Sequence, residues 1–313
     1  MTTIYEGIKA LGETKGYSVD YFNSGENIRK IKVNKIEEAA RKAKNADVAI
    51  VVVGDNSMRY KWKDKTAGEN MARASLDLFG KQLDLVKAIK ETGTPVIIVL
   101  VNGKPISEPW LQNNIPAILE AWEPGNLGGQ ALAEIVFGEV NPSGKLPLTV
   151  ARSVGQLRMI YNHKPSAYFH KYADEKKTPL YPFGYGLSYT SYKYSTPLLS
   201  NSTLNKENTI LVTTEITNTG KVDGEEVAQL YIRDNVSSVT RPVKELKGYQ
   251  RVFLKAGETK KIKFTLNSES LAFYDIDMNY VVEPGTFTIM TGSSSKNSDL
   301  KKTILTVNKK IKL

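Results

Sequence analysis

The chain has 313 residues, of which 41% are hydrophobic and 24% are charged, and it contains no cysteine. These proportions are ordinary for a globular protein of about two domains. The absence of cysteine excludes disulfides, thiolate nucleophiles and cysteine-ligated zinc. The net charge is +10, but Lys and Arg are scattered among acidic residues. This pattern predicts a solvated basic surface and no nucleic-acid partner.

Membrane and targeting segments are not expected either. No apolar run reaches the ~18–20 residues that are needed to span a bilayer. The first residues lack the basic region and apolar stretch of a signal peptide. The sequence therefore predicts no membrane association, and it leaves the localisation of this chain open.

The first half of the chain reads as alternating strands and helices. A first strand is a candidate near Tyr17, and the Ala-, Glu- and Lys-rich stretch 35–46 predicts a helix that Asn34 can cap. The apolar runs 47–54, 96–101 and 117–122 predict buried strands, and 76–92 and 128–137 predict helices. This order favours a mainly parallel sheet that is covered by helices on both faces.

In the second half of the chain, apolar and polar residues alternate with a period of two. Alternating strands are expected over 210–217, 227–233, 251–254, 261–266 and 287–290, which indicates a β-sandwich. Between the halves lies a proline-rich segment with several aromatic residues, among them Tyr181 and Phe183. We interpret it as an ordered linker that packs on the first domain. The predicted domains are therefore 1–152, a linker over 153–192, and 193–313.

Four segments, taken together with their order and spacing along the chain, resemble glycoside hydrolase family 3, of the β-glucosidase type. They are Val99–Pro105, Glu120–Pro147, Tyr181–Thr190, and the stretch that runs from Asn218 to Gly248. The resemblance implies the fold class α/β plus all-β, with a flavodoxin-like α/β sandwich domain followed by a fibronectin type III-like β-sandwich. It also implies a retaining, exo-acting β-glycosidase that releases terminal β-linked glucose or a related sugar such as xylose.

Family members carry a TIM barrel, a (β/α)₈ domain, before the α/β domain, and that barrel supplies the aspartate nucleophile. This chain begins where such a barrel would already have ended, so we assign the nucleophile to no residue here. The resemblance implies a barrel domain or subunit as partner and a periplasmic or secreted parent enzyme. The chain alone is expected to be incomplete and inactive.

The loop that follows the first apolar strand holds the candidate site residues. The segment Gly68–Arg73 resembles the family's acid/base motif, so Glu69 is predicted to be the general acid/base and Arg73 to match the motif's arginine. Ala72 stands where many members have aspartate. Arg73 and Trp62 are predicted to contact the substrate. The alternatives for these side chains are a salt bridge that holds the loop and packing beneath it.

Two other functions compete with this one. A non-catalytic carbohydrate-binding or scaffolding module derived from such an enzyme is the main alternative, although Glu69 in that motif favours an enzyme. A nucleotide-binding module is disfavoured because the glycines of 125–129 match no phosphate-binding pattern. No cofactor or metal is expected, since His163 and His170 are the only histidines and a zinc site needs three or four protein ligands.

Overall fold

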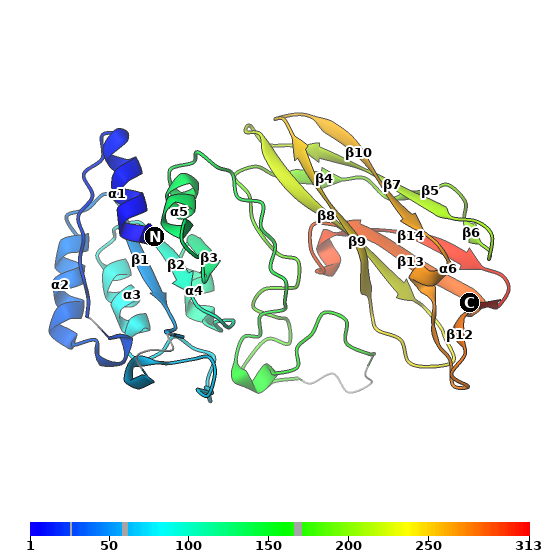
Figure 1. The fold of residues 1–313 in the computed structure, drawn as a ribbon, viewed down its shortest axis with the longest axis horizontal. Helices are drawn as coiled ribbons and strands as arrows, with labels where there is room; N and C mark the ends of the chain where they lie inside the picture. The colour runs from blue at the N-terminus through cyan, green and yellow to red at the C-terminus, as the bar shows by residue number, and fades with distance from the viewer. Residues whose placement is uncertain (26, 58–61, 166–170) are drawn as a thin grey trace. The chain divides into compact units, whose positions relative to one another are not determined.

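The computed structural model describes residues 1–313 except 26, 58–61 and 166–170 (Figure 1). His170, one of the two histidines, therefore lies outside the described residues, as does Tyr60, an aromatic residue of the loop that holds the candidate site. Two compact units emerge from the contacts within the chain. The first comprises residues 1–140 and 150–157, and the second comprises residues 141–149 and 158–313.

The centre of the first unit is a parallel sheet of three strands in the order β1-β2-β3. The strands are β1 (Ala49–Gly54), β2 (Val96–Val101) and β3 (Ala117–Trp122). The sequence predicted β2 and β3 with these bounds. In β2, Ile98 and Val99 are fully buried, as expected for a central strand of a parallel sheet. Because all three strands run in one direction, their carboxyl ends meet at one edge.

Five helices accompany this sheet in the described part of the first unit: α1 (Ile4–Thr14), α2 (Val33–Ala43), α3 (Gln82–Glu91), α4 (Pro109–Asn114) and α5 (Gly128–Val136). Short 3₁₀ helices are η1 (Ile28–Lys30), η2 (Trp62–Asp64) and η3 (Val154–Gln156). Ile36 of α2 and Val86 of α3 share one hydrophobic core with Val51 and Ile98. Helices α1 and α5 approach closely, since a Cβ added to Gly7 would lie 2.1 Å from the Gly129 carbonyl oxygen.

Three local predictions were wrong. Tyr17 follows helix α1 and lies in no strand; Thr3 caps α1 through a reciprocal capping box with Glu6. Asn34 lies inside α2, whose N-cap is Lys32 without a side-chain bond. Helix α3 begins at Gln82 and not at residue 76, because residues 76–81 belong to the loop described below. None of the described helices is both long and apolar enough to cross a membrane.

The second unit is a β-sandwich, as predicted. One sheet has the order β6-β14-β13-β8-β9, a second has β10-β7-β4 with β5 paired to β7, and a small sheet has β11-β12-β15. Apolar side chains of the two larger sheets alternate inward and form one core, which includes Ile216, Leu230 and Phe287. The strands are β4 (Tyr192–Tyr194), β5 (Leu198–Leu199), β6 (Thr203–Leu204), β7 (Ile210–Asn218), β8 (Gly224–Asp234), β9 (Glu245–Leu254), β10 (Thr259–Leu266), β11 (Phe273–Tyr274), β12 (Tyr280–Val282), β13 (Gly285–Gly292), β14 (Leu300–Val307) and β15 (Ile311–Lys312), with short helices α6 (Ser268–Leu271) and η4 (Asn297–Asp299).

The expected linker makes contacts within this second unit. Tyr161 stacks on Phe183 with ring centroids 4.2 Å apart, and it meets Tyr231 of β8 edge-on at 5.8 Å. Its hydroxyl accepts a hydrogen bond from the Leu246 N–H at 3.2 Å. We expected the linker to pack on the first domain, whereas these aromatic side chains cover the face of β8 that points away from the sandwich core. The domain limits at 152 and 192 stay predictions.

Candidate active site

The site begins where β1 ends. Gly54 has a φ of +152°, and a Cβ there would lie 1.9 Å from the Val101 carbonyl oxygen, so this position needs glycine. The Gly54 N–H donates to Oε1 of Gln82 and its carbonyl accepts from Nε2, both at 2.8 Å. Gln82 is buried at the start of α3. The loop between β1 and α3 is therefore fixed at both ends by one side chain.

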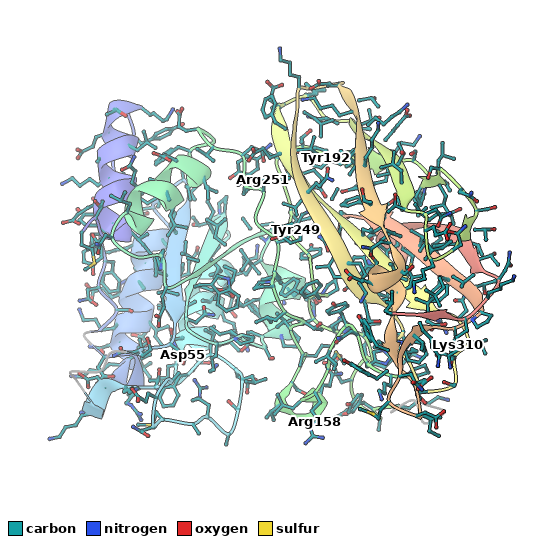
Figure 2. The ribbon with its side chains drawn as sticks, turned by 45° about the vertical axis from the view of Figure 1, so that its right-hand side comes forward. Asp55, Arg158, Tyr192, Tyr249, Arg251 and Lys310 are labelled. Atoms are coloured by element: carbon teal, nitrogen blue, oxygen red, sulfur yellow. The ribbon has the colours of Figure 1, made fainter. Side chains whose placement is uncertain are left out.

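Asp55, the first residue of this loop (labelled in Figure 2), is the centre of a buried ion-pair cluster. Its side chain is 1% exposed, and its Oδ1 lies 2.7 Å from Nη1 of Arg73, while its Oδ2 lies 2.9 Å from Nζ of Lys104. The Thr66 hydroxyl donates to Oδ1 at 3.1 Å. A buried carboxylate is costly unless it is paired and hydrogen-bonded. Asp55 therefore joins two distant parts of the loop to Lys104, which lies shortly after the end of β2.

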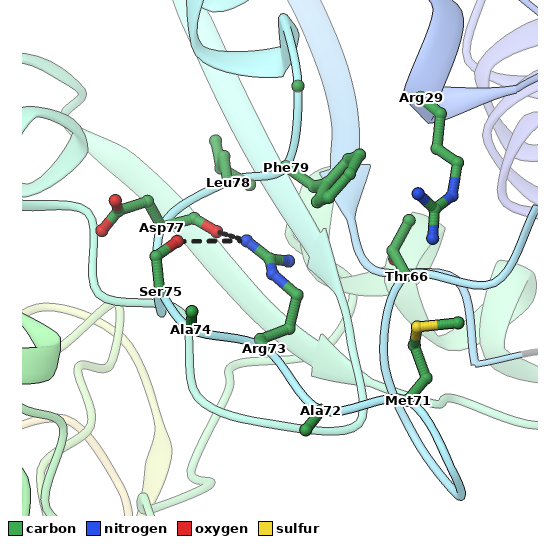
Figure 3. A pocket seen from close by; sticks show the side chains of 11 residues that line it. Arg29, Thr66, Met71, Ala72, Arg73, Ala74, Ser75, Asp77, Leu78 and Phe79 are labelled. Carbon is green, nitrogen blue, oxygen red and sulfur yellow. Dashed lines mark hydrogen bonds between the residues drawn. The ribbon is translucent and has the colours of Figure 1, made fainter.

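Arg73 holds the second half of the loop in place through hydrogen bonds to its backbone and side chains. Its Nη2 donates to the Asp77 carbonyl at 2.8 Å and to the Ser75 hydroxyl at 3.4 Å (Figure 3). The guanidinium carbon lies 4.9 Å from the ring centroid of Phe79. These contacts match the salt-bridge interpretation of Arg73, and its side chain is only 10% exposed. Direct contact between Arg73 and a sugar stays a prediction.

Glu69 lies on a sharp turn, and its side chain is exposed. Its neighbours Gly68 and Asn70 both have left-handed backbone conformations, with φ of +98° and +58°. The Met71 N–H donates to the Gly68 carbonyl at 2.9 Å. Lys65, which is 1% exposed, donates from Nζ to the Glu69 carbonyl. Because a buried ammonium needs hydrogen-bond partners, this contact helps to hold the backbone of the turn, and Glu69 itself is an exposed residue.

Trp62 lies in the same loop, at the start of η2. Its side chain lies outside the described part of the structure, so its predicted contact with substrate stays a prediction.

Asn56 and Thr66 hold the two sides of the loop together. The Asn56 N–H donates to Thr66 Oγ1 at 2.8 Å, and the Asn56 carbonyl accepts from the Thr66 N–H at 2.8 Å.

The ends of β2 and β3 add a group that the sequence analysis did not single out. Burial raises the pKa of Glu120 to about 7, against weaker opposing hydrogen bonds from the Trp122 N–H and the Asn102 side chain. The Trp122 N–H donates to Glu120 Oε1 at 3.2 Å, and Trp122 has a φ of +51°, which is uncommon for a bulky residue. Strand periodicity reveals neither the burial of Glu120 nor this backbone conformation.

A pocket of about 510 Å³ opens in the same loop (Figure 3). Arg29, Thr66 and residues of the stretch 71–80 line it. The Glu69 turn connects Thr66 to Met71, which both line the pocket. An exposed glutamate therefore lies in the chain between two residues that line a pocket of ligand size, at the edge where open α/β sheets hold their ligands. Such a carboxyl can give a proton to a bound molecule or take one from it.

Comparison with known families matches residues 1–189 to "Glycosyl hydrolase family 3 C-terminal domain" and residues 226–295 to "Fibronectin type III-like domain". The chain is 48% identical over 273 residues to a beta-xylosidase of Formosa agariphila, covering 86% of this chain and 37% of the relative. It is 40% identical over 291 residues to a periplasmic beta-glucosidase of Salmonella typhimurium, covering 88% of this chain and 37% of the relative. A solved β-glucosidase from Erythrobacter marinus superposes with a TM-score of 0.88 at 36% identity, covering 98% of this chain and 43% of that one.

These matches define the class of the protein. The first unit is an α/β domain of glycoside hydrolase type, followed by a fibronectin type III-like sandwich. The chain belongs to glycosyl hydrolase family 3, whose C-terminal domain it contains. It spans less than half the length of these relatives.

Proposed function

We propose that this chain is the C-terminal part of a retaining, exo-acting β-glycosidase, in which Glu69 is the general acid/base. In a retaining mechanism one carboxylate attacks the anomeric carbon, and a second carboxyl protonates the leaving oxygen and then activates water. Glu69 would serve as the second. The substrate class is a glycoside with a terminal β-linked glucose or a related sugar such as xylose.

The observation that carries this proposal is the way the Glu69 turn is built. Two left-handed residues turn the chain around Glu69, and the buried Lys65 holds its carbonyl. A turn held in this way at the carboxyl edge of a sheet presents a carboxyl group in a fixed place, which acid/base catalysis requires. The described backbone contacts of the turn leave the side chain exposed.

A barrel domain is proposed as the partner that supplies the nucleophile and most contacts to the sugar. Its approach would also remove water from the loop, which raises the pKa of a carboxyl group and prepares it to donate a proton. Trp62 and Arg73 are proposed substrate contacts in the assembled enzyme, with Arg73 also holding the loop through Asp55. By similarity to the periplasmic relative, we propose that the parent enzyme is exported.

The test is hydrolysis of a chromogenic β-glucoside and β-xyloside by the purified chain, alone and mixed with a separately produced barrel domain of the Formosa relative. We expect activity only in the mixture. Glu69→Ala should lower the rate by roughly 10²–10⁴-fold, and azide should restore part of it, because a small nucleophile can replace the base-activated water. Glu91→Ala, at an exposed glutamate that ends α3, is the matched control and should keep full activity.

Two results would contradict the proposal. Turnover by the chain alone would mean that both carboxylates lie within these residues. A Glu69→Ala mixture as active as the Glu91→Ala mixture would remove Glu69 from the chemistry.

A carbohydrate-binding module remains a second candidate, because aromatic side chains are exposed on the sandwich. Tyr249 is 70% exposed on β9, and Phe253 shares its outward face with Arg251 between them (Figure 2). Exposed aromatic rings beside a guanidinium suit stacking on sugars. Affinity electrophoresis in soluble xylan and glucan would detect this function: retardation that Tyr249→Ala and Phe253→Ala abolish would support it, and equal mobility in gels with and without glycan would exclude it.

A further inference from the structure

The pocket beside the Glu69 turn contains two guanidinium groups around one aromatic ring. The guanidinium carbons of Arg29 and Arg73 lie 5.0 Å and 4.9 Å from the ring centroid of Phe79. They are therefore no farther apart than the sum of these two distances. Figure 3 shows the Arg29 guanidinium directed into the space between Phe79 and Thr66. The two positive charges thus converge on one opening of about 510 Å³.

The charges around these two arginines are not equally compensated. Arg73 is paired with Asp55, which also binds Lys104. To the described residues, the Arg29 guanidinium donates one hydrogen bond, to the Lys65 carbonyl. Among the described residues, no carboxylate lies within ion-pair distance of Arg29. Since a guanidinium has five N–H donors, Arg29 brings a positive charge and spare donors to the pocket.

Asp77 is the one acidic residue among the described residues that line the pocket, and its carboxylate points elsewhere. Asp77 contacts Arg73 through its backbone carbonyl, and its carboxylate is directed away from both arginines (Figure 3). Its charge acts on Glu108, whose pKa is raised by burial and, to a smaller extent, by Asp77. Among the described lining residues, two guanidinium groups therefore adjoin the pocket, one of them paired with Asp55, and the carboxylate of Asp77 is turned away from them.

We propose that this pocket is a subsite for an oxyanion carried by the glycan, the carboxylate of a uronic acid or a sulfate ester, with Arg29 as the residue that selects it. This inference rests on the proposed function, because the glycan would reach the pocket from the neighbouring Glu69 turn. A planar guanidinium matches the geometry of such groups and can bind them through two parallel hydrogen bonds. The pocket volume lies within the range of small-molecule sites.

The experiment is a binding titration of the full 313-residue chain with methyl β-D-glucuronide, methyl β-D-glucoside and glucose 6-sulfate. Ionic strength is kept at about 0.15 M, where unspecific charge attraction is screened beyond ~8 Å. We expect at least one charged ligand to bind at least tenfold more tightly than the neutral glucoside, and inorganic sulfate to compete with it. A preference for the glucuronide would identify the uronic acid as the source of the oxyanion, and a preference for the sulfated sugar would identify the ester.

Arg29→Gln should bring the ratio of dissociation constants close to one, and Arg29→Lys should keep an intermediate ratio. The matched control is Lys30→Gln, because it removes the same charge from the same 3₁₀ helix at an exposed residue that does not line the pocket. Thermal unfolding of each variant checks that the first unit, which contains the pocket, remains folded. Arg29 is exposed, so its replacement should shift the transition little.

Equal affinity for the charged and neutral ligands would overturn the inference, as would an equal loss of preference in Arg29→Gln and Lys30→Gln. The measurement involves neither the barrel nor the hydrolysis step. A selective site in a chain whose Glu69 proves dispensable would therefore contradict only the proposed function. Conversely, Glu69-dependent hydrolysis without oxyanion preference would contradict only this inference.

Discussion

The sandwich core and the loop after β1 are ordered by different forces. In the sandwich, most of the fully buried residues are apolar: Ile289, Leu305 and Phe287 are 0–1% exposed, and the polar residues among them, such as Thr214 and Asn218, are uncharged. In the loop, equally buried positions hold Lys65 and Asp55. Burial of apolar surface is favourable without regard to direction, whereas a buried charge is tolerated only with particular partners in particular places. The core therefore supplies stability, whereas the buried charges of the loop cost stability and fix the positions of their partners.

The largest expected effect lies in the sandwich core. Phe287→Ala should lower the free energy of unfolding of the second unit by about 3–5 kcal/mol, because it removes a buried ring and leaves a cavity. Denaturant unfolding followed by far-UV circular dichroism measures this loss. Val236→Ala, at a residue that is 79% exposed, should change the value by less than ~0.5 kcal/mol. A loss below ~1 kcal/mol for Phe287→Ala would mean that the core is looser than this packing implies.

The second effect tests the buried charges. Asp55→Asn keeps the shape of the side chain but leaves Arg73 and Lys104 without their counter-charge. Breaking a buried pair costs up to ~3–5 kcal/mol; because these two cations are 10% and 20% exposed, we expect about 2 kcal/mol, confined to the first unit. Calorimetry of the variant should show a lower transition for that unit alone. An unchanged transition would show that the cluster adds nothing to stability.

The third effect concerns pH and Glu120. Its folded-state pKa is raised to about 7 from 4.5, so the folded state holds a proton that the unfolded state has lost. The contribution of this group to stability is fully present below about pH 4.5 and is lost as the pH rises through about 7. Glu120→Gln, which is neutral at every pH, should therefore become more stable than the parent chain above pH 7, by on the order of 2 kcal/mol.

Unfolding measured from pH 4 to pH 9 checks this difference, and the two curves should run together at the acidic end. The exposed Glu91→Gln serves as the control, and its curve should follow that of the parent chain at every pH. A constant offset between Glu120→Gln and the parent chain would contradict the burial of an ionisable carboxyl at this position.

The sequence predicted the parts of the fold in which a pattern repeats. The period-two strands 210–217 and 261–266 and the apolar runs of β2 and β3 appear as expected, since each reports a local conformation together with burial. Helix α1 was missed although Ile4, Ile8 and Leu11 follow a helical spacing, because the segment Ile4–Thr14 contains two glycines and is short. Much of its support comes from α5, more than a hundred positions away, where Gly7 approaches Gly129.

The candidate site was predictable as residue types but not as contacts. The family motif placed Glu69 and Arg73 in one loop, which needs only sequence order. The partners of Asp55, by contrast, lie 18 and 49 positions away along the chain. No local pattern shows that Lys65 is buried or that Arg29 approaches Phe79. Such contacts depend on how the loop closes, which is fixed by tertiary pairings such as that of Gln82 with Gly54.

The smallest expected effect on stability tests whether the buried Lys65 holds the Glu69 turn in place. Lys65→Met replaces a buried ammonium by an apolar side chain of similar length, so the desolvation cost disappears together with the ammonium's hydrogen bonds, among them the one to the Glu69 carbonyl. We expect a change in the free energy of unfolding below about 1 kcal/mol. The Glu69 turn should nevertheless loosen, because its flanking residues have left-handed conformations that relax once the carbonyl is released. Hydrogen exchange at the Met71 amide, which bonds to Gly68, should accelerate at least tenfold, while the Ile98 amide in β2 keeps its rate. Equal protection of Met71 in the variant and the parent chain would show that backbone preference alone holds the turn, and that the buried charge has no part in placing Glu69.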